Sequence, residues 1–295
     1  MLKNTNLPRQ NIVDLSNEIM VLNAEYTPLL TLLLANGKNT VAKDVVVRRK
    51  IKELSTTASG ARKEGADAPD SENSTYTWVS NNLEIFSKAT VISGTAGAIY
   101  GSTAEALAKE INDRLTELKF DMEKSILTGT KKDEDGTSGR KMNGLLNLVD
   151  EDNVIDVEGA TLTKAYISNA MMKLYQLKVT GDKYMFVNPA DVEKVIELYT
   201  TATNARINFS SADSTVGIDV TEILTPFGKA KMVMSTNVPT GTILIGALDY
   251  MELPQLREAQ YEPLAKTGDA EKGQVVAEAT IITAPKSLAK IINFI

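Results

Sequence analysis

The sequence predicts an α+β protein in which a long extended arm is followed by one long helix and then by an α/β region. The arm runs from near Gly37 to Thr90, with β-type residues at its two ends and small or polar residues between them. The helix is expected directly after it, over Thr103–Thr128. Loops longer than about 15 residues are uncommon inside a compact domain. We therefore expect the arm to pack on a neighbouring copy of the chain, which is typical of an assembly protein.

The composition is that of a globular protein with few options for catalysis. Of 295 residues, 43% are apolar and 24% are charged, and 38 acidic against 32 basic residues give a net charge of −6. An acidic chain gains nothing overall from binding nucleic acid, because that affinity rests on neutralised phosphates. The chain has no cysteine and no histidine, which excludes disulfides, cysteine-based zinc sites and a Ser-His-Asp triad. Carboxylate, lysine or tyrosine chemistry stays open, although no catalytic residue is expected.

Residues 1–37 are expected to form an N-terminal arm. Apolar residues at helical spacing between Ile12 and Leu22 predict one helix. The apolar stretch Leu29–Leu34, which follows a proline, can dock on its own domain or on a neighbour, and its own domain is favoured. We find no signal-peptide pattern at the start, and the most apolar early stretch, Tyr26–Ala35, is broken by Pro28 and is too short to cross a bilayer. We therefore expect a soluble, cytosolic protein.

Residues 38–92 are expected to form an extended loop, which is a long hairpin. Alternating residues predict a strand over Lys43–Leu54, the composition predicts a loop over Ser55–Ser74, and β-type residues return over Thr75–Ser93. An isolated two-stranded hairpin is marginal in water. Its support is therefore expected to come from a partner.

Charge is sorted along this loop, because the outgoing strand is basic while the tip and the return are acidic. The residues expected to make contacts between subunits are Arg48, Arg49, Lys50, Lys52, Glu64, Asp67, Asp70 and Trp78. Opposite charges on adjoining subunits would meet there and fix the register of assembly. Two alternatives stay open. One is a solvated charged face, and the other is DNA binding by Arg48–Lys52, which is weaker because no aromatic residue interleaves this short cluster in the sequence.

The long helix has the strongest local pattern in the chain. Ser102 and Glu105 fit a capping box, in which each side chain satisfies a free backbone N–H. Apolar residues keep one face of the helix from Ala104 to Ile126, and Gly129 stands where a C-terminal glycine is expected. We expect this helix to be a scaffold and not a site.

The rest of the chain is expected to form connections, an α/β region and a returning tail. Residues 130–160 are polar and acidic and look like exposed connections. The α/β region should contain a helix over Thr161–Leu177, a strand over Lys183–Val187, a helix from Pro189 to about Thr200, and strands around 216–223, 231–234 and 242–245. The tail from Val275 to Ile295 alternates enough to be β, and it is expected to pack on the long helix.

Three stretches look like ligand sites but lack essential residues. Gly268–Gly273 has the glycine spacing of a phosphate-binding loop, but Gln274 and Val275 replace its lysine and hydroxyl residue. Lys131–Met142 superficially matches a calcium loop, yet its first and twelfth positions cannot supply ligands. Asp150–Asp152 could hold a cation loosely, but acidic runs are usually solvated. We therefore expect no cofactor and no metal.

The order of parts resembles that of the major capsid proteins of tailed bacteriophages. Their fold, called the Johnson fold, is shared with herpesvirus floor domains and encapsulin shells. Four segments carry the resemblance, in one order over nearly the whole chain: Asn81–Lys88 (NNLEIFSK), Arg140–Leu145 (RKMNGL), Thr225–Gly228 (TPFG) and Leu264–Asp269 (LAKTGD).

The resemblance implies a virion protein, not an enzyme, that assembles in the host cytoplasm. Subunits would form pentamers and hexamers of an icosahedral shell around double-stranded DNA, without sequence-specific binding and without a membrane. The implied parts are an N-terminal arm (1–37), an extended E-loop over the adjacent subunit (38–92), a peripheral P domain (93–160) with its spine helix (103–128), an axial A domain (161–245), and a C-terminal return to the P domain (246–295). A portal is implied as a partner, and decoration proteins stay open.

Two departures from the family bear on assembly. Some relatives carry a scaffolding domain before the arm, whereas here the arm starts close to Met1. We therefore expect either that this domain was never present or that a separate protein provides the scaffolding. Some relatives crosslink neighbours through lysine and asparagine, but no motif identifies a pair here, and we expect no crosslink. The main alternative is an encapsulin-type compartment shell with an enzyme cargo. A non-viral surface protein and an enzyme with a carboxylate mechanism are the other readings.

Overall fold

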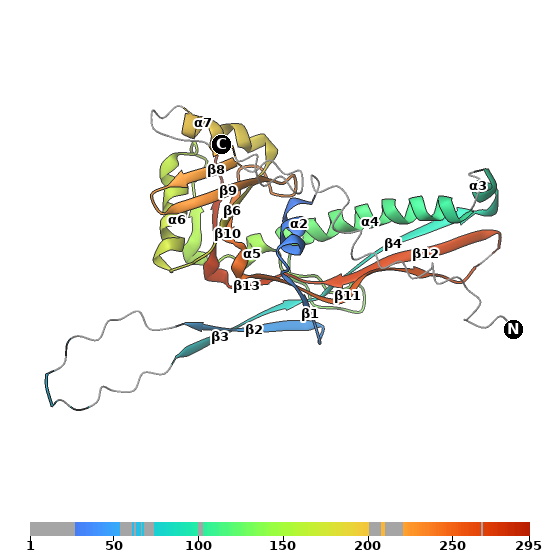
Figure 1. Cartoon of the computed structure of the whole chain (residues 1–295), viewed down its shortest axis with the longest axis horizontal. Helices are drawn as coiled ribbons and strands as arrows, with labels where there is room; N and C mark the ends of the chain where they lie inside the picture. Colours follow the sequence, from blue (N-terminus) through green and yellow to red (C-terminus); the bar gives the residue numbers. More distant parts are fainter. Residues whose placement is uncertain are drawn as a thin grey trace.

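The computed structural model describes residues 27–53, 61, 63–65, 67, 74–99, 103–200, 208–209, 221–266 and 268–295. Within these residues the chain is an elongated α+β protein (Figure 1). A compact α/β unit lies at one end, a long helix and a long sheet run away from it, and a two-stranded hairpin projects below the unit. The helix expected between Ile12 and Leu22, together with Ser102 of the capping box, lies outside the described residues.

Seven strands form the sheet of the α/β unit, in the order β5-β14-β10-β6-β9-β8-β7. In chain order they are β5 (Val154–Asp156), β6 (Lys183–Val187), β7 (Asn208–Phe209), β8 (Thr221–Thr225), β9 (Gly228–Met234), β10 (Ile243–Ala247) and β14 (Leu288–Ile292). Strand β6 has the predicted bounds and lies in the middle, and all of its residues are buried. This burial is typical of a strand that is covered on both faces.

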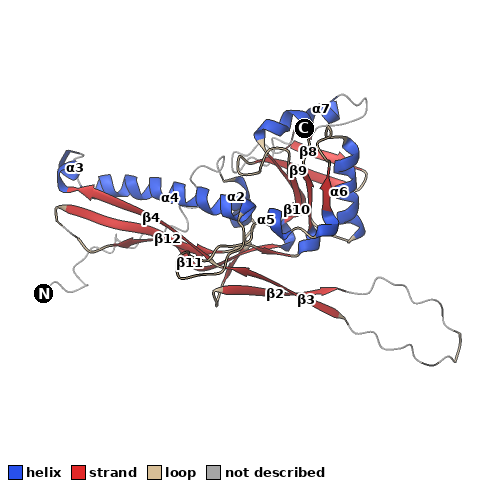
Figure 2. Cartoon of the chain, turned by 180° about the vertical axis from the view of Figure 1, so that it is seen from behind, coloured by secondary structure: helices blue, strands red, loops and turns tan. Residues whose placement is uncertain are grey.

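Two helices cover one face of this sheet (Figure 2). They are α6 (Lys164–Gln176) and α7 (Pro189–Thr200), both close to their predicted bounds. Ala170 of α6 and Val195 of α7 are fully buried in a cluster with side chains of β6 and β10. The opposite face of the sheet packs towards the long helix, which joins the two parts of the molecule into one core.

A second sheet runs along the long helix α4 (Thr103–Thr128), in the order β1-β11-β12-β4, and β13 also pairs with β11. Its strands are β1 (Asn39–Val41), β4 (Glu84–Ser93), β11 (Met251–Pro263), β12 (Ala270–Ala279) and β13 (Ile282–Thr283). The short helix α3 (Gly94–Ile99) connects β4 to α4. Figure 2 shows α4 lying along this sheet, and Phe86 and Val275 share a buried cluster with Leu118 of the helix.

Helix α4 spans Thr103–Thr128, the bounds that the sequence predicts. Its apolar face is buried towards the C-terminal end, where Leu115, Leu118 and Ile126 are fully buried, whereas Ala104 at the other end is exposed. The residue directly after the helix, Gly129, is required to be glycine for a steric reason. A Cβ there would lie 2.4 Å from the Ser125 carbonyl oxygen, so the close approach of the backbone requires glycine.

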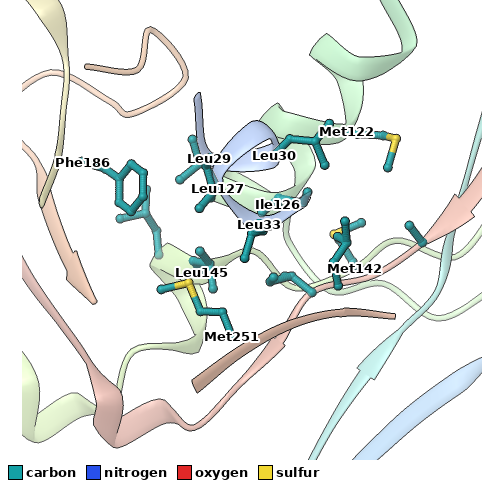
Figure 3. Close-up of a cluster of buried hydrophobic side chains, with 14 of the residues drawn as sticks. Leu29, Leu30, Leu33, Met122, Ile126, Leu127, Met142, Leu145, Phe186 and Met251 are labelled. Atoms are coloured by element: carbon teal, nitrogen blue, oxygen red, sulfur yellow. The ribbon is translucent and has the colours of Figure 1, made fainter. Parts of the chain in front are cut away.

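Helix α2 spans Pro28–Ala35 and docks on its own subunit, as expected. Its leucines meet side chains from α4, β6 and β11 in a buried cluster (Figure 3). The cluster includes Leu29, Leu30, Leu33, Ile126, Phe186 and Met251.

The structure differs from the expectation for residues 130–160, because only part of this segment is exposed. Met142 and Leu145 are fully buried, and Leu145 begins the short helix α5 (Leu145–Leu148). Strand β5 then adds to the edge of the seven-stranded sheet by pairing in parallel with β14. Charged residues in the flanking stretches conceal the buried apolar run in the sequence.

The tail divides between the two sheets, so its predicted return to the long helix is right only in part. Strand β12 packs against α4, and Val275 and Ala277 contribute to the shared core. Strand β14 instead inserts between β5 and β10 of the α/β unit. Ile291 is fully buried there. The chain therefore ties both parts of the molecule together at its end.

Candidate assembly surface

The hairpin consists of β2 (Val46–Glu53) and β3 (Thr75–Asn82), which pair only with each other among the described strands. The predicted longer hairpin is wrong in one respect. The return stretch is interrupted at Leu83, and its second half forms β4, which pairs with β12 in the other sheet. The projecting strands are thus β2 and β3 alone. This leaves a narrow two-stranded ribbon with two distinct faces.

The outer face of the hairpin is basic and aromatic. The register places Lys50 opposite Trp78 and Lys52 opposite Tyr76, and side chains that are directly opposite point to the same face. Arg48 lies on this face because it is two residues from Lys50. The term outer face is used below for Arg48, Lys50, Lys52, Tyr76 and Trp78.

The cations and rings of the outer face lie close together. The Lys50 Nζ is 3.7 Å from the centroid of the Tyr76 ring and 5.9 Å from that of the Trp78 ring. Trp78 is 64% exposed and Tyr76 is 49% exposed. No aromatic residue lies within the basic cluster in the sequence, but the fold places two rings from the opposite strand beside it. The sequence argument against an aromatic contribution is therefore wrong.

The inner face of the hairpin is fixed to its own subunit. Arg49 Nε and Nη2 each lie 2.8 Å from the Glu252 Oε2 in β11. Val47 is buried in a small cluster with Leu83 and Ile282. Of the four basic residues predicted to contact a neighbour, Arg49 thus has an acidic partner within its own chain. Sequence spacing could not reveal this partner, which is separated by 203 residues.

The acidic residues of the tip are only partly described. Glu64 and Asp67 are exposed, and Asp70 lies outside the described residues. Within the described part of the chain, no ion pair joins Glu64 to a cation of β2. The structure therefore does not bring Glu64 and the strand cations together inside one hairpin.

Asn81 fixes the base of the hairpin. Its side chain is fully buried, and Nδ2 donates to the carbonyl oxygens of Asn143 at 2.8 Å and of Ile281 at 2.6 Å. Its Oδ1 accepts from the backbone N–H groups of Asn143 at 2.7 Å and of Asn82 at 2.9 Å. One amide therefore ties β3 to the connection after α4 and to the segment before β13.

Arg140 holds the point where β3 gives way to β4. Its Nε donates to the Leu83 carbonyl oxygen at 2.8 Å, and its guanidinium also pairs with Glu278 of β12. Glu278 is almost fully buried and accepts a second contact from Arg257 Nε at 3.1 Å. A buried carboxylate is costly unless it is paired, and two arginines meet that requirement here. The direction in which the hairpin leaves the body is thus set by polar contacts.

A polar groove of about 550 Å³ lies between β4 and α4, and its lining includes Glu84 and Asp121. Asp121 pairs with Lys88 at 2.6 Å, and Glu84 accepts the backbone N–H of Met142 at 3.2 Å. Burial raises the pKa of Glu84 above its ordinary value. Both carboxylates of the groove therefore take part in contacts that hold β4 in place.

A family model described as SU10 major capsid protein matches residues 2–294. The chain belongs to this family. It is a major capsid protein and a structural component of the virion, not an enzyme. A search of curated proteins finds no match.

Solved structures show the same fold for this capsid protein at low sequence identity. The cyanophage A-1(L) capsid asymmetric unit is 14% identical, with 99% of each chain covered and a TM-score of 0.61. The satellite phage P4 procapsid that includes the size determination (Sid) protein is 10% identical, over 90% of this chain and 91% of that chain, with a TM-score of 0.57. The holo-SrpI encapsulin complex from Synechococcus elongatus PCC 7942 is 11% identical, over 87% and 84%, with a TM-score of 0.56.

The four segments that carried the resemblance occupy defined structural positions in the capsid protein. Asn81–Lys88 and Arg140–Leu145 meet at the base of the hairpin, through the contacts of Asn81, Arg140 and Glu84. Thr225–Gly228 forms the turn between β8 and β9, where Gly228 has a φ of +129°. Leu264–Asp269 lies between β11 and β12.

The sequence stretches that resemble phosphate- or cation-binding loops do not form a ligand site in the described residues. A Cβ on Gly273 would lie 2.1 Å from the Tyr261 hydroxyl oxygen, so this glycine gives room to a side chain and not to a phosphate. No cluster of three or more acidic side chains in the described residues could hold a metal ion. None of the helices in the described part is long and apolar enough to cross a membrane.

Proposed function

We propose that this capsid protein assembles as pentamers and hexamers into an icosahedral shell that encloses the packaged double-stranded DNA of a tailed phage or prophage. The observation that carries the proposal is the family match, which covers residues 2–294. The shared fold of the phage capsid structures supports it. The DNA is enclosed without sequence-specific binding, which agrees with the net charge of −6.

Each part of the molecule then has a role in the shell. The β2–β3 hairpin acts as the extended loop and lies over the adjacent subunit, and α4 acts as the spine of a peripheral domain. The seven-stranded sheet with α6 and α7 acts as the axial domain. The shape of the molecule supports this division, because the hairpin projects from the body while its base is held by buried polar contacts.

Charge pairing between subunits sets the register of assembly in this proposal. Arg48, Lys50 and Lys52 meet tip acids of a neighbour, among them Glu64, Asp67 and Asp70. Arg49 is assigned to its own subunit because it contacts Glu252. Opposite charges on facing surfaces steer association and disfavour incorrect partners.

The further partners are a separate scaffolding protein and a portal. An encapsulin-type shell is the alternative, and the likeness to the SrpI complex supports a shared fold for both classes. At 11% identity that likeness says nothing about contents. The family match favours the phage shell.

Expression of the chain with and without its neighbouring genes, followed by negative-stain electron microscopy, tests the proposal. Closed shells or discrete pentamers and hexamers are expected. Shells filled with protein cargo would move the function to the encapsulin class. A stable monomer under both conditions would contradict the proposal.

A further inference from the structure

We propose that α2 is a latch within the subunit: it opens as one unit while both sheets stay folded, and its docking on Glu123 fixes the α/β unit relative to α4. This device goes beyond the proposed function and does not depend on it, because it belongs to the single chain. Helix α2, strand β1 and the hairpin strand β2 follow one another in the sequence. The latch therefore lies at the start of the segment that leads into the hairpin.

The sequence of α2 gives this helix little stability of its own. It has eight residues, and isolated helices shorter than about 12–15 residues are marginal in water. Its first turn carries no acidic residue, its last turn carries no basic residue, and Thr27 at the N-cap position makes no capping hydrogen bond. We therefore expect α2 to be helical only while it is docked on the rest of the subunit.

Glu123 of α4 supplies the cap that α2 lacks. Its Oε2 accepts the backbone N–H of Leu30 at 2.7 Å, and its Oε1 accepts that of Leu29 at 3.1 Å. The Glu123 side chain is fully buried. Loss of this contact with α2 still in place would leave two N–H groups without a partner in an apolar environment, which is costly. The first turn of α2 and its contact with Glu123 should therefore be lost together.

The leucines of α2 contact both halves of the molecule. Leu29, Leu30 and Leu33 belong to one buried cluster with Phe186 of the α/β unit and Met122 of α4. Figure 3 shows α2 between these two side chains. Interiors are closely packed, so a docked α2 restricts the motion of one half relative to the other. Undocking of α2 removes packing from both halves at once.

The attachments beyond the C-terminal end of α2 set the size of the unit that opens. Lys38 Nζ lies 3.2 Å from the Asp249 carboxylate in an exposed ion pair, which adds little stability. Strand β1 then forms a three-residue parallel pairing at the edge of the second sheet. Strand β2 is held more firmly, because Arg49 binds Glu252. We therefore expect α2 and β1 to open together and the opening to stop before β2.

Amide hydrogen exchange of the dissociated full-length subunit, measured at several low urea concentrations, tests the latch without any variant. The N–H groups of α2 and β1 should exchange at least about tenfold faster than those of α6, through an opening that depends little on urea. Exchange of α2 at the rate of α6, with the urea dependence of global unfolding, would overturn the proposal.

A pair of variants tests the role of Glu123. Glu123→Leu keeps a side chain of similar size but removes both acceptor oxygens, so exchange in α2 should rise by at least about tenfold while exchange in α6 stays unchanged. Asp113→Leu is the matched control, because Asp113 is an exposed carboxylate on the same helix. Equal exchange of α2 in both variants would overturn the proposal. Glu123→Gln retains one acceptor oxygen and should give an intermediate rate, and it replaces the leucine variant if that protein does not fold.

A distance measurement tests whether α2 fixes the two halves. The chain has no cysteine, so Ala104→Cys in α4 and Tyr175→Cys in α6, both at exposed positions, can carry two spin labels. Double electron–electron resonance should give a broader distance distribution in the Glu123→Leu background than in the Asp113→Leu background. Equal widths would overturn this part of the proposal. All three measurements use dissociated subunits, so failure to form shells would contradict the proposed function and leave the latch standing.

Discussion

The Glu123 carboxylate in α4 caps the first turn of α2, with Leu30 as its nearer partner. Oε2 accepts the backbone N–H of Leu30 at 2.7 Å, and Oε1 accepts that of Leu29 at 3.1 Å. Thr27, at the N-cap position, makes no capping hydrogen bond of its own. The free N–H groups of a helix start are therefore satisfied by a residue that lies 93 positions further along the chain.

The first prediction concerns the pH dependence of stability through Glu123. Complete burial raises the pKa of this group from 4.5 to about 7, and the two N–H donors only partly offset that effect. The folded state thus binds this proton more tightly than the unfolded state. Its contribution is present below about pH 4.5 and is lost as the pH rises through 7, by on the order of 3 kcal/mol.

Urea unfolding of dissociated subunits between pH 5 and pH 8 checks this prediction. Glu123→Gln cannot titrate, so its free energy of unfolding should fall less than that of the wild type over this range. If the free energy of unfolding fell equally with pH in both proteins, the raised pKa of Glu123 would be contradicted.

The second prediction concerns Asn81 at the base of the hairpin. Asn81→Ala removes four hydrogen bonds and leaves the N–H groups of Asn82 and Asn143 and two carbonyl oxygens without this partner. We expect a loss of about 2–3 kcal/mol in the free energy of unfolding. Amide hydrogen exchange in β2 and β3 should become faster. Ser80→Ala, one residue away on the opposite face, is the control, and equal exchange in both variants would count against the role of Asn81.

The third prediction concerns the steric role of glycine after α4. Gly129→Ala would place a Cβ 2.4 Å from the Ser125 oxygen and 2.9 Å from the Met142 oxygen, so it should destabilise the subunit by about 1–3 kcal/mol. Gly136→Ala is a matched control, because nothing lies within 4 Å of a Cβ there. Thermal unfolding of both variants measures the difference. Equal melting temperatures would show that the backbone can move away at no cost.

The fourth prediction concerns charge pairing between subunits. Arg48→Glu should reduce assembly at low ionic strength by at least about tenfold, and a compensating Glu64→Arg should restore it. Lys124→Glu, an exposed reversal on α4, serves as the control. Light scattering at several salt concentrations follows assembly. Normal assembly of the Arg48 variant at low salt would contradict charge pairing between subunits at this residue.

The sequence predicted those helices and strands whose apolar pattern is complete within the element itself. The bounds of α4 and β6 follow from a continuous apolar face and from a short apolar run, respectively. Strand β11 was not predicted, because Pro254 and charged residues interrupt its pattern and because its register with β12 shifts twice. Its partner β12 follows directly in the chain, whereas β1, which pairs with its other edge, is distant in sequence.

The break at Leu83 was also not predicted, although Asn81 and Asn82 directly before it are poor strand residues. Its cause is tertiary, since Arg140 binds the Leu83 carbonyl oxygen from a connection beyond α4. The same holds for the assembly surface. The sequence identifies the basic cluster, but only the pairing of β2 with β3 shows that Lys50 lies beside Trp78 while Arg49 points to Glu252.

A cryo-electron microscopy reconstruction of assembled shells tests the central claim most directly, because it can trace residues 46–82 of every subunit. The account predicts that each hairpin lies across an adjacent subunit, with Trp78 buried in that contact and Arg49 still paired with Glu252 of its own chain. Hairpins that contact only their own subunit in closed shells would contradict it.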